Sequence, residues 1–337
     1  MEKLRIGIIC PSEIAFRRFM PAIQKCDGAK YIGIAHASEK EWIGDKEADS
    51  TVIENEKKKA QSFKDEYGGK VFSSYGELLE SSDIDAVYLP LPPALHFKWA
   101  KKALENGKHI FLEKPSTTSA GDTRELLEIA REKGLSVHEN YMFQFHKQIE
   151  EIQEIVGSGK IGDVRLYRIA FGFPQRQKND FRYNKELGGG ALLDCGGYTI
   201  KLASILLGNT AQLKYSKLNY TDDFDVDIYG SAAMVNDEGV TAQLSFGMDN
   251  SYKCELEIWG SKGSILTGRI LTAPDGFEPT AEVTVGNETE TVKLSADDTF
   301  KKSIEKFLKC VRDEEQREEN YKAILRQAKL VDEVKGE

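Results

Sequence analysis

Three side chains near the middle of the chain have the types and spacing of a proton-transfer site. An acid, a phenol and an amine, namely Asp194, Tyr198 and Lys201, follow one another at helical intervals. They lie in the segment Gly188-Gly-Gly-Ala-Leu-Leu-Asp194-Cys-Gly-Gly-Tyr198-Thr-Ile-Lys201. On a helix this spacing places all three on one face. A phenol beside an ammonium ionises more readily, which suits Tyr198 as a proton donor to an alkoxide. The alternative is a buried packing helix with a satisfied tyrosine.

Two glycines interrupt this predicted helix. Gly196 and Gly197 each destabilise a helix by about 1 kcal/mol relative to alanine. We therefore expect another group to lie very close to the helix backbone at this point.

A lysine in Glu113-Lys114-Pro115 is a second candidate for chemistry. It directly follows the buried-type strand predicted at His109 to Leu112 and is held by the next proline. In that position its ammonium is expected to point into a crevice and donate a hydrogen bond to a reacting oxygen. The alternative is an ordinary surface charge.

Two loops are expected to hold a nucleotide at the carboxyl edge of a parallel sheet. One joins a first strand to a helix, where Cys10 and Ser12 replace the two usual glycines and only the small Ala15 remains. Ser12 still offers an N–H and a hydroxyl, and the alternative is a tight turn without a nucleotide. The other loop is rigid with prolines and suits a flat ring. The cofactor-binding residues predicted here are Cys10, Pro11, Ser12, Glu13, Ile14, Leu89, Pro90, Leu91, Pro92 and His96.

The end of the second predicted strand bears on the choice of cofactor. It reads Ala35-His36-Ala37-Ser38 and lacks the acid that would accept hydrogen bonds from the ribose of NAD. NADP is therefore favoured, with NAD as the alternative. The expected phosphate partners are Ser38, His36, Arg17 and Arg18, unless the two arginines are ordinary solvated charges.

The elements that must position these residues fall into two patterns. Up to residue 140, short apolar runs alternate with helical segments, which predicts a doubly wound parallel sheet, the Rossmann arrangement. From residue 141 to 337, alternating segments such as Val164 to Phe173 predict an α+β domain with a large open, mainly antiparallel sheet. A charged stretch, Glu39 to Lys59, is expected to be a loop that runs into a helix. Two charged helices, Asp298 to Arg312 and Glu319 to Val334, close the chain.

The composition excludes several classes of protein. The 337 residues carry a formal charge of −9, whereas nucleic-acid binders show a basic footprint. The longest apolar runs fall short of a membrane span, and the first residues lack the features of a signal peptide. Five scattered cysteines and five histidines form no disulfide framework and no metal motif. We expect a metal-free, two-domain cytoplasmic protein without nucleic-acid or membrane partners.

These motifs together resemble the glucose–fructose oxidoreductase/inositol dehydrogenase (Gfo/Idh/MocA) family, over essentially the whole chain. The resemblance implies hydride transfer between NAD(P) and sugars or polyols. It implies that Lys114 is the active-site lysine, that Asp194 faces the substrate, and that Tyr198 stands where many members have a catalytic histidine. It also places Glu113, Lys114, Asn140 and Arg182 at the cofactor.

Within this family the sequence looks most similar to the sugar 3-ketoreductases of deoxysugar biosynthesis. The stretch Tyr88-Leu-Pro-Leu-Pro-Pro93 and Arg182-Tyr-x-x-Glu-Leu-Gly-Gly-Gly190 carry that likeness. It implies interconversion of a hydroxyl and a ketone on a nucleotide-activated sugar. The alternatives are a dehydrogenase of a free sugar or trans-diol, and a non-catalytic relative that binds a ligand. The resemblance also implies a homodimer or homotetramer through the C-terminal sheet, with Val226, Ile228 and Leu244 on a buried or interfacial face.

Overall fold

A computed structural model describes residues 2–42 and 50–336 of the chain. The chain divides by its internal contacts into two compact units, each described here by itself. Unit 1 comprises Met1–Asn140, Glu186–Gly188 and Phe300–Ala328, and unit 2 comprises Tyr141–Lys185, Gly189–Thr299 and Lys329–Glu337.

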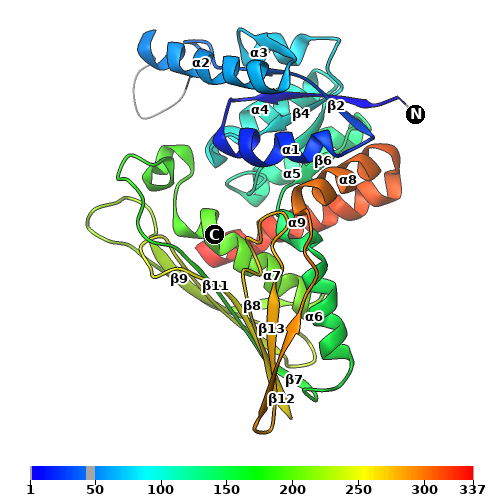
Figure 1. Ribbon diagram of the computed structural model, residues 1–337. Helices are drawn as coiled ribbons and strands as arrows, with labels where there is room; N and C mark the ends of the chain where they lie inside the picture. The colour runs from blue at the N-terminus through cyan, green and yellow to red at the C-terminus, as the bar shows by residue number, and fades with distance from the viewer. Residues whose placement is uncertain (1, 43–49, 337) are drawn as a thin grey trace. The chain divides into compact units, whose positions relative to one another are not determined.

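Unit 1 contains a six-stranded parallel sheet in the order β3-β2-β1-β4-β5-β6 (Figure 1). This order confirms the doubly wound sheet predicted from the sequence. Apolar runs form the inner strands because both faces are covered, as the fully buried β4 shows. The strands are β1 (Leu4–Ile9), β2 (Ala29–Ala35), β3 (Lys70–Phe72), β4 (Ala86–Leu89), β5 (His109–Leu112) and β6 (Val137–Glu139).

Helices connect these strands, and serine side chains cap two of them. The hydroxyl of Ser74 accepts a hydrogen bond from the N–H of Glu77, and that of Ser119 accepts one from Asp122, which satisfies N–H groups that the first helical turn leaves open. Part of the charged stretch Glu39 to Lys59 lies outside the described residues. The helical elements are η1, a π-helical turn (Ala15–Phe19), α1 (Met20–Gln24), α2 (Ser50–Tyr67), α3 (Tyr75–Glu80), α4 (Pro93–Glu105), α5 (Ala120–Glu132), α8 (Thr299–Arg312) and α9 (Glu314–Lys335).

The two C-terminal helices differ from the expected division at residue 140, because most of their length belongs to unit 1. The ring of Phe307 in α8 packs edge-on against Phe111 of β5, with 5.5 Å between centroids. Tyr321 and Ile324 of α9 lie in the core of unit 1. An amphipathic helix joins the core that buries its apolar face, and that core need not be the nearest one in sequence.

Unit 2 contains an eight-stranded sheet in the order β14-β13-β12-β11-β7-β10-β9-β8 (Figure 1). All neighbouring pairs are antiparallel except β7 and β10, which run parallel. The α+β prediction with a mainly antiparallel sheet is therefore confirmed. The strands are β7 (Val164–Gly172), β8 (Gln212–Asn219), β9 (Tyr229–Val235), β10 (Thr241–Gly247), β11 (Lys253–Gly260), β12 (Gly263–Gly268), β13 (Thr280–Val285) and β14 (Glu288–Lys293).

Helix α7 packs against β7 and β10 and covers one face of this sheet. Val226, Ile228 and Leu244 are buried in the core of unit 2. On the other face, the exposed positions of the strands include Tyr215, Tyr229, Trp259 and Leu266. The remaining helical elements of unit 2 are η2 (Met142–Phe145), α6 (Lys147–Gly157), η3 (Phe181–Tyr183), η4 (Lys185–Leu187, shared with unit 1), η5, a π-helical turn (Leu192–Gly196), and α7 (Gly197–Leu207).

One stretch, Lys185–Leu207, has the length and composition of a membrane span, but most of it is buried inside the protein, as in the core helix of a globular domain. Within the described parts of the chain, no group of three His, Cys, Asp or Glu side chains is placed to hold a metal ion.

Candidate active site

The loop after β1 keeps the turn of a dinucleotide-binding loop without its glycines. Cys10 adopts φ of +79°, a left-handed conformation that a side chain normally disfavours. The hydroxyl of Ser12 accepts a hydrogen bond (3.2 Å) from the N–H of Ala15, the first residue of the π-helical turn that follows. The backbone geometry of this loop therefore suits a pyrophosphate even though its residue types do not match the glycine pattern.

Cys10 is half-buried, and its thiol is chemically quiet. Burial raises its pKa to about 12, with the nearby Glu56 carboxylate acting in the same direction. A thiol that stays protonated is neither a nucleophile nor a metal ligand. Cys10 thus shapes the turn instead of reacting.

The loop after β2 contains an acid that the sequence argument overlooked. Glu41 Oε2 accepts hydrogen bonds from the N–H of Ser38 (3.0 Å) and from its hydroxyl (2.8 Å). The same carboxylate also accepts from the N–H groups of Tyr75 and Gly76, at 3.0 and 2.9 Å, at the start of α3. Ser38 therefore has both of its donors engaged by Glu41, whose carboxylate accepts four hydrogen bonds within the protein.

The other residues predicted around this cofactor subsite have different surroundings. His36 is buried and its Nδ1 lies 2.9 Å from the carbonyl oxygen of Ala37, so Nδ1 carries the proton. Glu13 forms an exposed ion pair with Arg17, and Arg18 and Ile14 are exposed. Their roles toward a phosphate remain predictions.

His96 lies between the proline-rich loop and the loop that carries Lys114. Its Nε2 lies 2.8 Å from the carbonyl oxygen of Leu91, and its Nδ1 lies 2.8 Å from that of Pro115. The ring is fully buried, and burial lowers its pKa to about 4. His96 therefore links the loop of residues 89–92 to the loop that carries Lys114, and its predicted contact with the cofactor stays a prediction.

Glu113, next to Lys114, ends in a buried polar network. Its Oε1 accepts hydrogen bonds from the hydroxyl of Tyr88 (2.7 Å) and from the side-chain amide of Asn140 (2.8 Å). Burial raises the pKa of Glu113, while these two donors and the Lys114 charge oppose that rise. Glu113, Lys114 and Asn140 are thus brought together at the ends of β5 and β6, as expected for one site.

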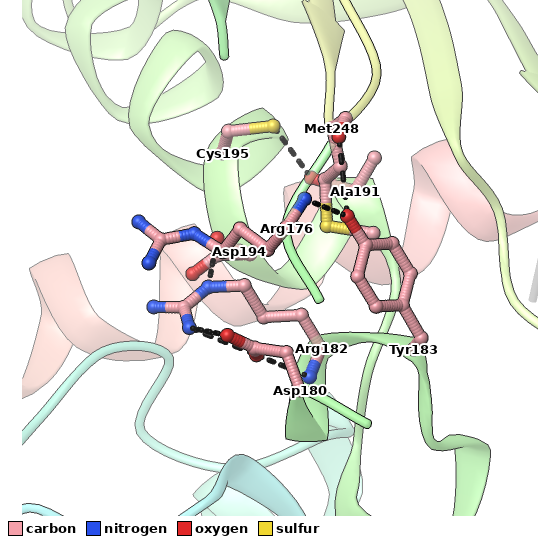
Figure 2. Close-up of polar contacts among 8 residues, drawn as sticks. All are labelled: Arg176, Asp180, Arg182, Tyr183, Ala191, Asp194, Cys195 and Met248. Carbon is pink, nitrogen blue, oxygen red and sulfur yellow. Dashed lines mark hydrogen bonds and ion pairs between the residues drawn. The ribbon is translucent and has the colours of Figure 1, made fainter. Parts of the chain in front are cut away.

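In unit 2 the predicted substrate residue Asp194 is held by an arginine (Figure 2). Arg182 donates from Nε to Asp194 Oδ2 at 2.7 Å, and its Nη1 lies 3.1 Å from Asp180 Oδ1. Burial alone would lower the pKa of Arg182, but the two carboxylates outweigh it and raise that pKa. Asp194 is therefore oriented by a permanently charged partner.

Tyr198 stands in an aromatic enclosure within unit 2. The rings of Tyr141, Phe143 and Phe171 surround it at centroid distances of 5.2, 5.8 and 5.4 Å. Its hydroxyl lies 3.8 Å from the sulfur of Met142. The Tyr198 ring is therefore held in place by aromatic packing.

The two helix glycines are explained by this enclosure. A Cβ on Gly197 would collide with the hydroxyl of Tyr141, and one on Gly196 would lie 3.1 Å from the ring of Phe246. The sequence predicted that another group lies very close to the helix backbone. This prediction is confirmed, and the groups are packed side chains of the protein itself. The stretch that contains Asp194 is a π-helical turn (Leu192–Gly196), so the 3.6-residue spacing used to place three side chains on one face does not apply across it.

The two groups belong to different units, with Lys114, Glu113 and Asn140 in unit 1 and Asp194, Tyr198 and Arg182 in unit 2. Residues 4–141 match the family described as oxidoreductase family, NAD-binding Rossmann fold. Residues 149–266 match the GFO/IDH/MocA C-terminal domain. The chain belongs to the GFO/IDH/MocA family. It is accordingly an NAD(P)-dependent oxidoreductase, as its sequence predicted.

Several family members are similar over their full length. A dTDP-3,4-didehydro-2,6-dideoxy-alpha-D-glucose 3-reductase of Actinomadura kijaniata is 36% identical, covering 98% of this chain and 95% of the relative. One of the same name from Streptomyces violaceoruber is also 36% identical, with 99% and 95% covered. The crystal structure of KijD10, a 3-ketoreductase from Actinomadura kijaniata in complex with NADP and TDP-benzene, superposes with a TM-score of 0.91 at 35% identity, covering 99% of this chain and 98% of that one. Further structures of KijD10 carry a lysine replaced by alanine or a tyrosine replaced by phenylalanine.

Proposed function

We propose that this family member is an NADPH-dependent ketoreductase that reduces a ketone on a nucleotide-activated deoxyhexose. The observation that carries the proposal is full-length similarity to dTDP-sugar 3-reductases, together with the presence of Lys114, Asp194 and Tyr198. The left-handed turn at Cys10 and the buried Glu113–Asn140 pair fit a dinucleotide at the carboxyl edge of the unit 1 sheet.

The proposed chemistry divides among three side chains. A bound nicotinamide supplies the hydride. The Lys114 ammonium donates a hydrogen bond to the carbonyl oxygen and stabilises the negative charge that develops there. Tyr198 then gives its hydroxyl proton to that oxygen. Asp194, fixed by Arg182, accepts hydrogen bonds from sugar hydroxyls and sets the orientation of the ring.

Cofactor choice and substrate class are tested together by following NADPH consumption. Purified protein is given NADPH or NADH with a panel of ketones: a nucleotide-activated 3-keto sugar, the free keto sugar and a cyclic diketone. The proposal expects turnover with the nucleotide-activated ketone and NADPH. Turnover confined to the free sugar or the diketone would show that the substrate class is wrong, and cofactor binding without any turnover would favour a ligand-binding relative.

We further propose that the protein is cytoplasmic and assembles through the open face of the unit 2 sheet. On this face Arg168 lies over the ring of Trp259, with 4.0 Å from its guanidinium carbon to the ring centroid. Tyr215, Tyr229 and Leu266 lie on the same face, each more than two-fifths exposed. A broad surface with several exposed aromatic side chains is typical of a subunit interface.

A further inference from the structure

A row of buried hydrogen bonds in unit 1 ends on the carboxylate beside Lys114. Nε2 of His138, in β6, lies 2.9 Å from the hydroxyl oxygen of Ser303 in α8. That hydroxyl lies 2.7 Å from Oδ1 of Asn140. The Asn140 amide in turn donates to Glu113 Oε1, as described above.

The chemistry of these groups fixes the direction of each hydrogen bond. An ionised carboxylate only accepts, so Asn140 turns its NH2 toward Glu113 and its oxygen toward Ser303. Ser303 has a single proton, and it must donate that proton to the Asn140 oxygen. His138 must therefore donate from Nε2 to the Ser303 oxygen. With Tyr88 donating from the other side, every proton in the row points toward Glu113.

The row favours the ionised form of Glu113, because two hydrogen bonds donated to Oε1 stabilise a carboxylate more than a protonated carboxyl group. A protonated Glu113 that donated to Asn140 would require the amide to turn over, and Ser303 would then face an NH2 group. Asn140 and Ser303 are fully buried, and His138 is nearly so. Water therefore cannot replace a hydrogen bond that is lost from this row. Lys114 is the charged group that faces Glu113, and the neighbouring Glu139 is engaged by the N–H of Ser116.

We propose that Ser303, supplied by the C-terminal helix α8, is a positioning residue for the reaction because it orients Asn140 and so keeps Glu113 ionised. An ionised Glu113 favours the ammonium form of Lys114, the form that donates to the reacting oxygen. This inference rests on the proposed function for the role of Lys114. The hydrogen-bond row itself does not depend on that role.

Ser303→Ala removes the hydroxyl with little change of volume, and Ser303→Thr keeps the hydroxyl but adds a methyl group to a fully buried site. Ser62→Ala is the matched control, because Ser62 is an exposed helical serine whose hydroxyl donates to the carbonyl of Lys58 in its own helix. The ionisation of Glu113 is followed by the infrared carboxyl band that disappears in Glu113→Gln. This readout needs neither substrate nor turnover.

We expect the apparent pKa of Glu113 to rise by about half to one pH unit in Ser303→Ala, because this shift corresponds to the free energy of one lost neutral hydrogen bond. The acid limb of the hydride-transfer rate should move by the same amount. Ser303→Thr should lower the melting temperature through overpacking, yet Glu113 should titrate in this variant as it does in the wild type. Should Ser303→Ala not fold, Ser303→Cys, a weaker donor of similar size, should shift the titration in the same direction.

Two outcomes would overturn the proposal: Ser303→Ala or Ser303→Cys titrating like the wild type, or Ser303→Thr shifting as far as Ser303→Ala. A shifted infrared titration in a protein that reduces none of the ketones above would instead count against the proposed function and leave the positioning role intact.

Discussion

Arg182 forms ion pairs with both Asp180 and Asp194, so its replacement should change both the stability and the activity of the protein. Replacing it with methionine leaves Asp180 and Asp194 facing each other without their cation. The three side chains retain 21%, 20% and 15% of their exposure. Removing one partner of a fully buried pair costs about 3–5 kcal/mol, and exposed pairs contribute about 0–1 kcal/mol.

With a fifth of each side chain exposed, we expect Arg182→Met to destabilise unit 2 by about 2–3 kcal/mol. For a domain of this size that corresponds to a melting temperature lower by about 4–12 °C. Because Asp194 also loses its orientation, hydride transfer should slow by about 10-fold to 100-fold even where the variant is fully folded.

The assay combines thermal unfolding with single-turnover kinetics well below the melting temperature. Arg176→Met is the matched control, since Arg176 is a nearby exposed arginine (Figure 2). Its guanidinium lies over the ring of Phe173. This variant should leave both measurements close to those of the wild type. An Arg182→Met protein with wild-type melting temperature and rate would refute the role given to this cluster.

Three further outcomes are expected. NADPH should bind more tightly than NADH in nicotinamide fluorescence titrations, because no acid ends β2 and the Glu41 carboxylate in the following loop already accepts four hydrogen bonds from the protein; equal binding would contradict this. Light scattering should show that the protein is a dimer or tetramer, and Trp259→Glu on the open face should shift the protein toward the monomer. A wild-type protein that is monomeric at micromolar concentration would exclude this assembly. Tyr198→Phe should slow single-turnover hydride transfer less than Lys114→Ala does, because water or a substrate hydroxyl can replace its proton; a larger loss would reverse the two roles.

The fold was predictable because its signals are local. Apolar runs such as Ala86–Leu89 and the turn around Asn236 and Gly239 specify strands and hairpins from neighbouring residues alone. The parallel pairing of β7 with β10 was not predictable in this way, because their contact depends on the packing of the whole sheet.

The sequence singled out candidate site residues but not the partners that hold them. Lys114 and Tyr198 stand out by type and flanking sequence, whereas the Arg182–Asp194 pair required the π-helical turn to be known. Glu41 lies three residues beyond Ser38, outside the position where a ribose-binding acid is expected. Ser303 lies 163 residues from Asn140, and nothing in either local sequence marks the contact.

Single-turnover hydride transfer by Lys114→Ala tests the central claim most directly. Enzyme preloaded with NADPH is mixed with an excess of nucleotide-activated 3-keto sugar, and the loss of NADPH absorbance is recorded, so that slow product release cannot mask the step. Lys133→Ala, an exposed lysine at the end of α5, is the control. We predict that Lys114→Ala transfers hydride about 10²–10³-fold more slowly than the wild type, because one charged donor at a developing alkoxide contributes a rate factor of that size. The affinity of Lys114→Ala for the cofactor should be largely kept, and the control variant should transfer hydride at the wild-type rate. Hydride transfer at the wild-type rate in Lys114→Ala would contradict this prediction.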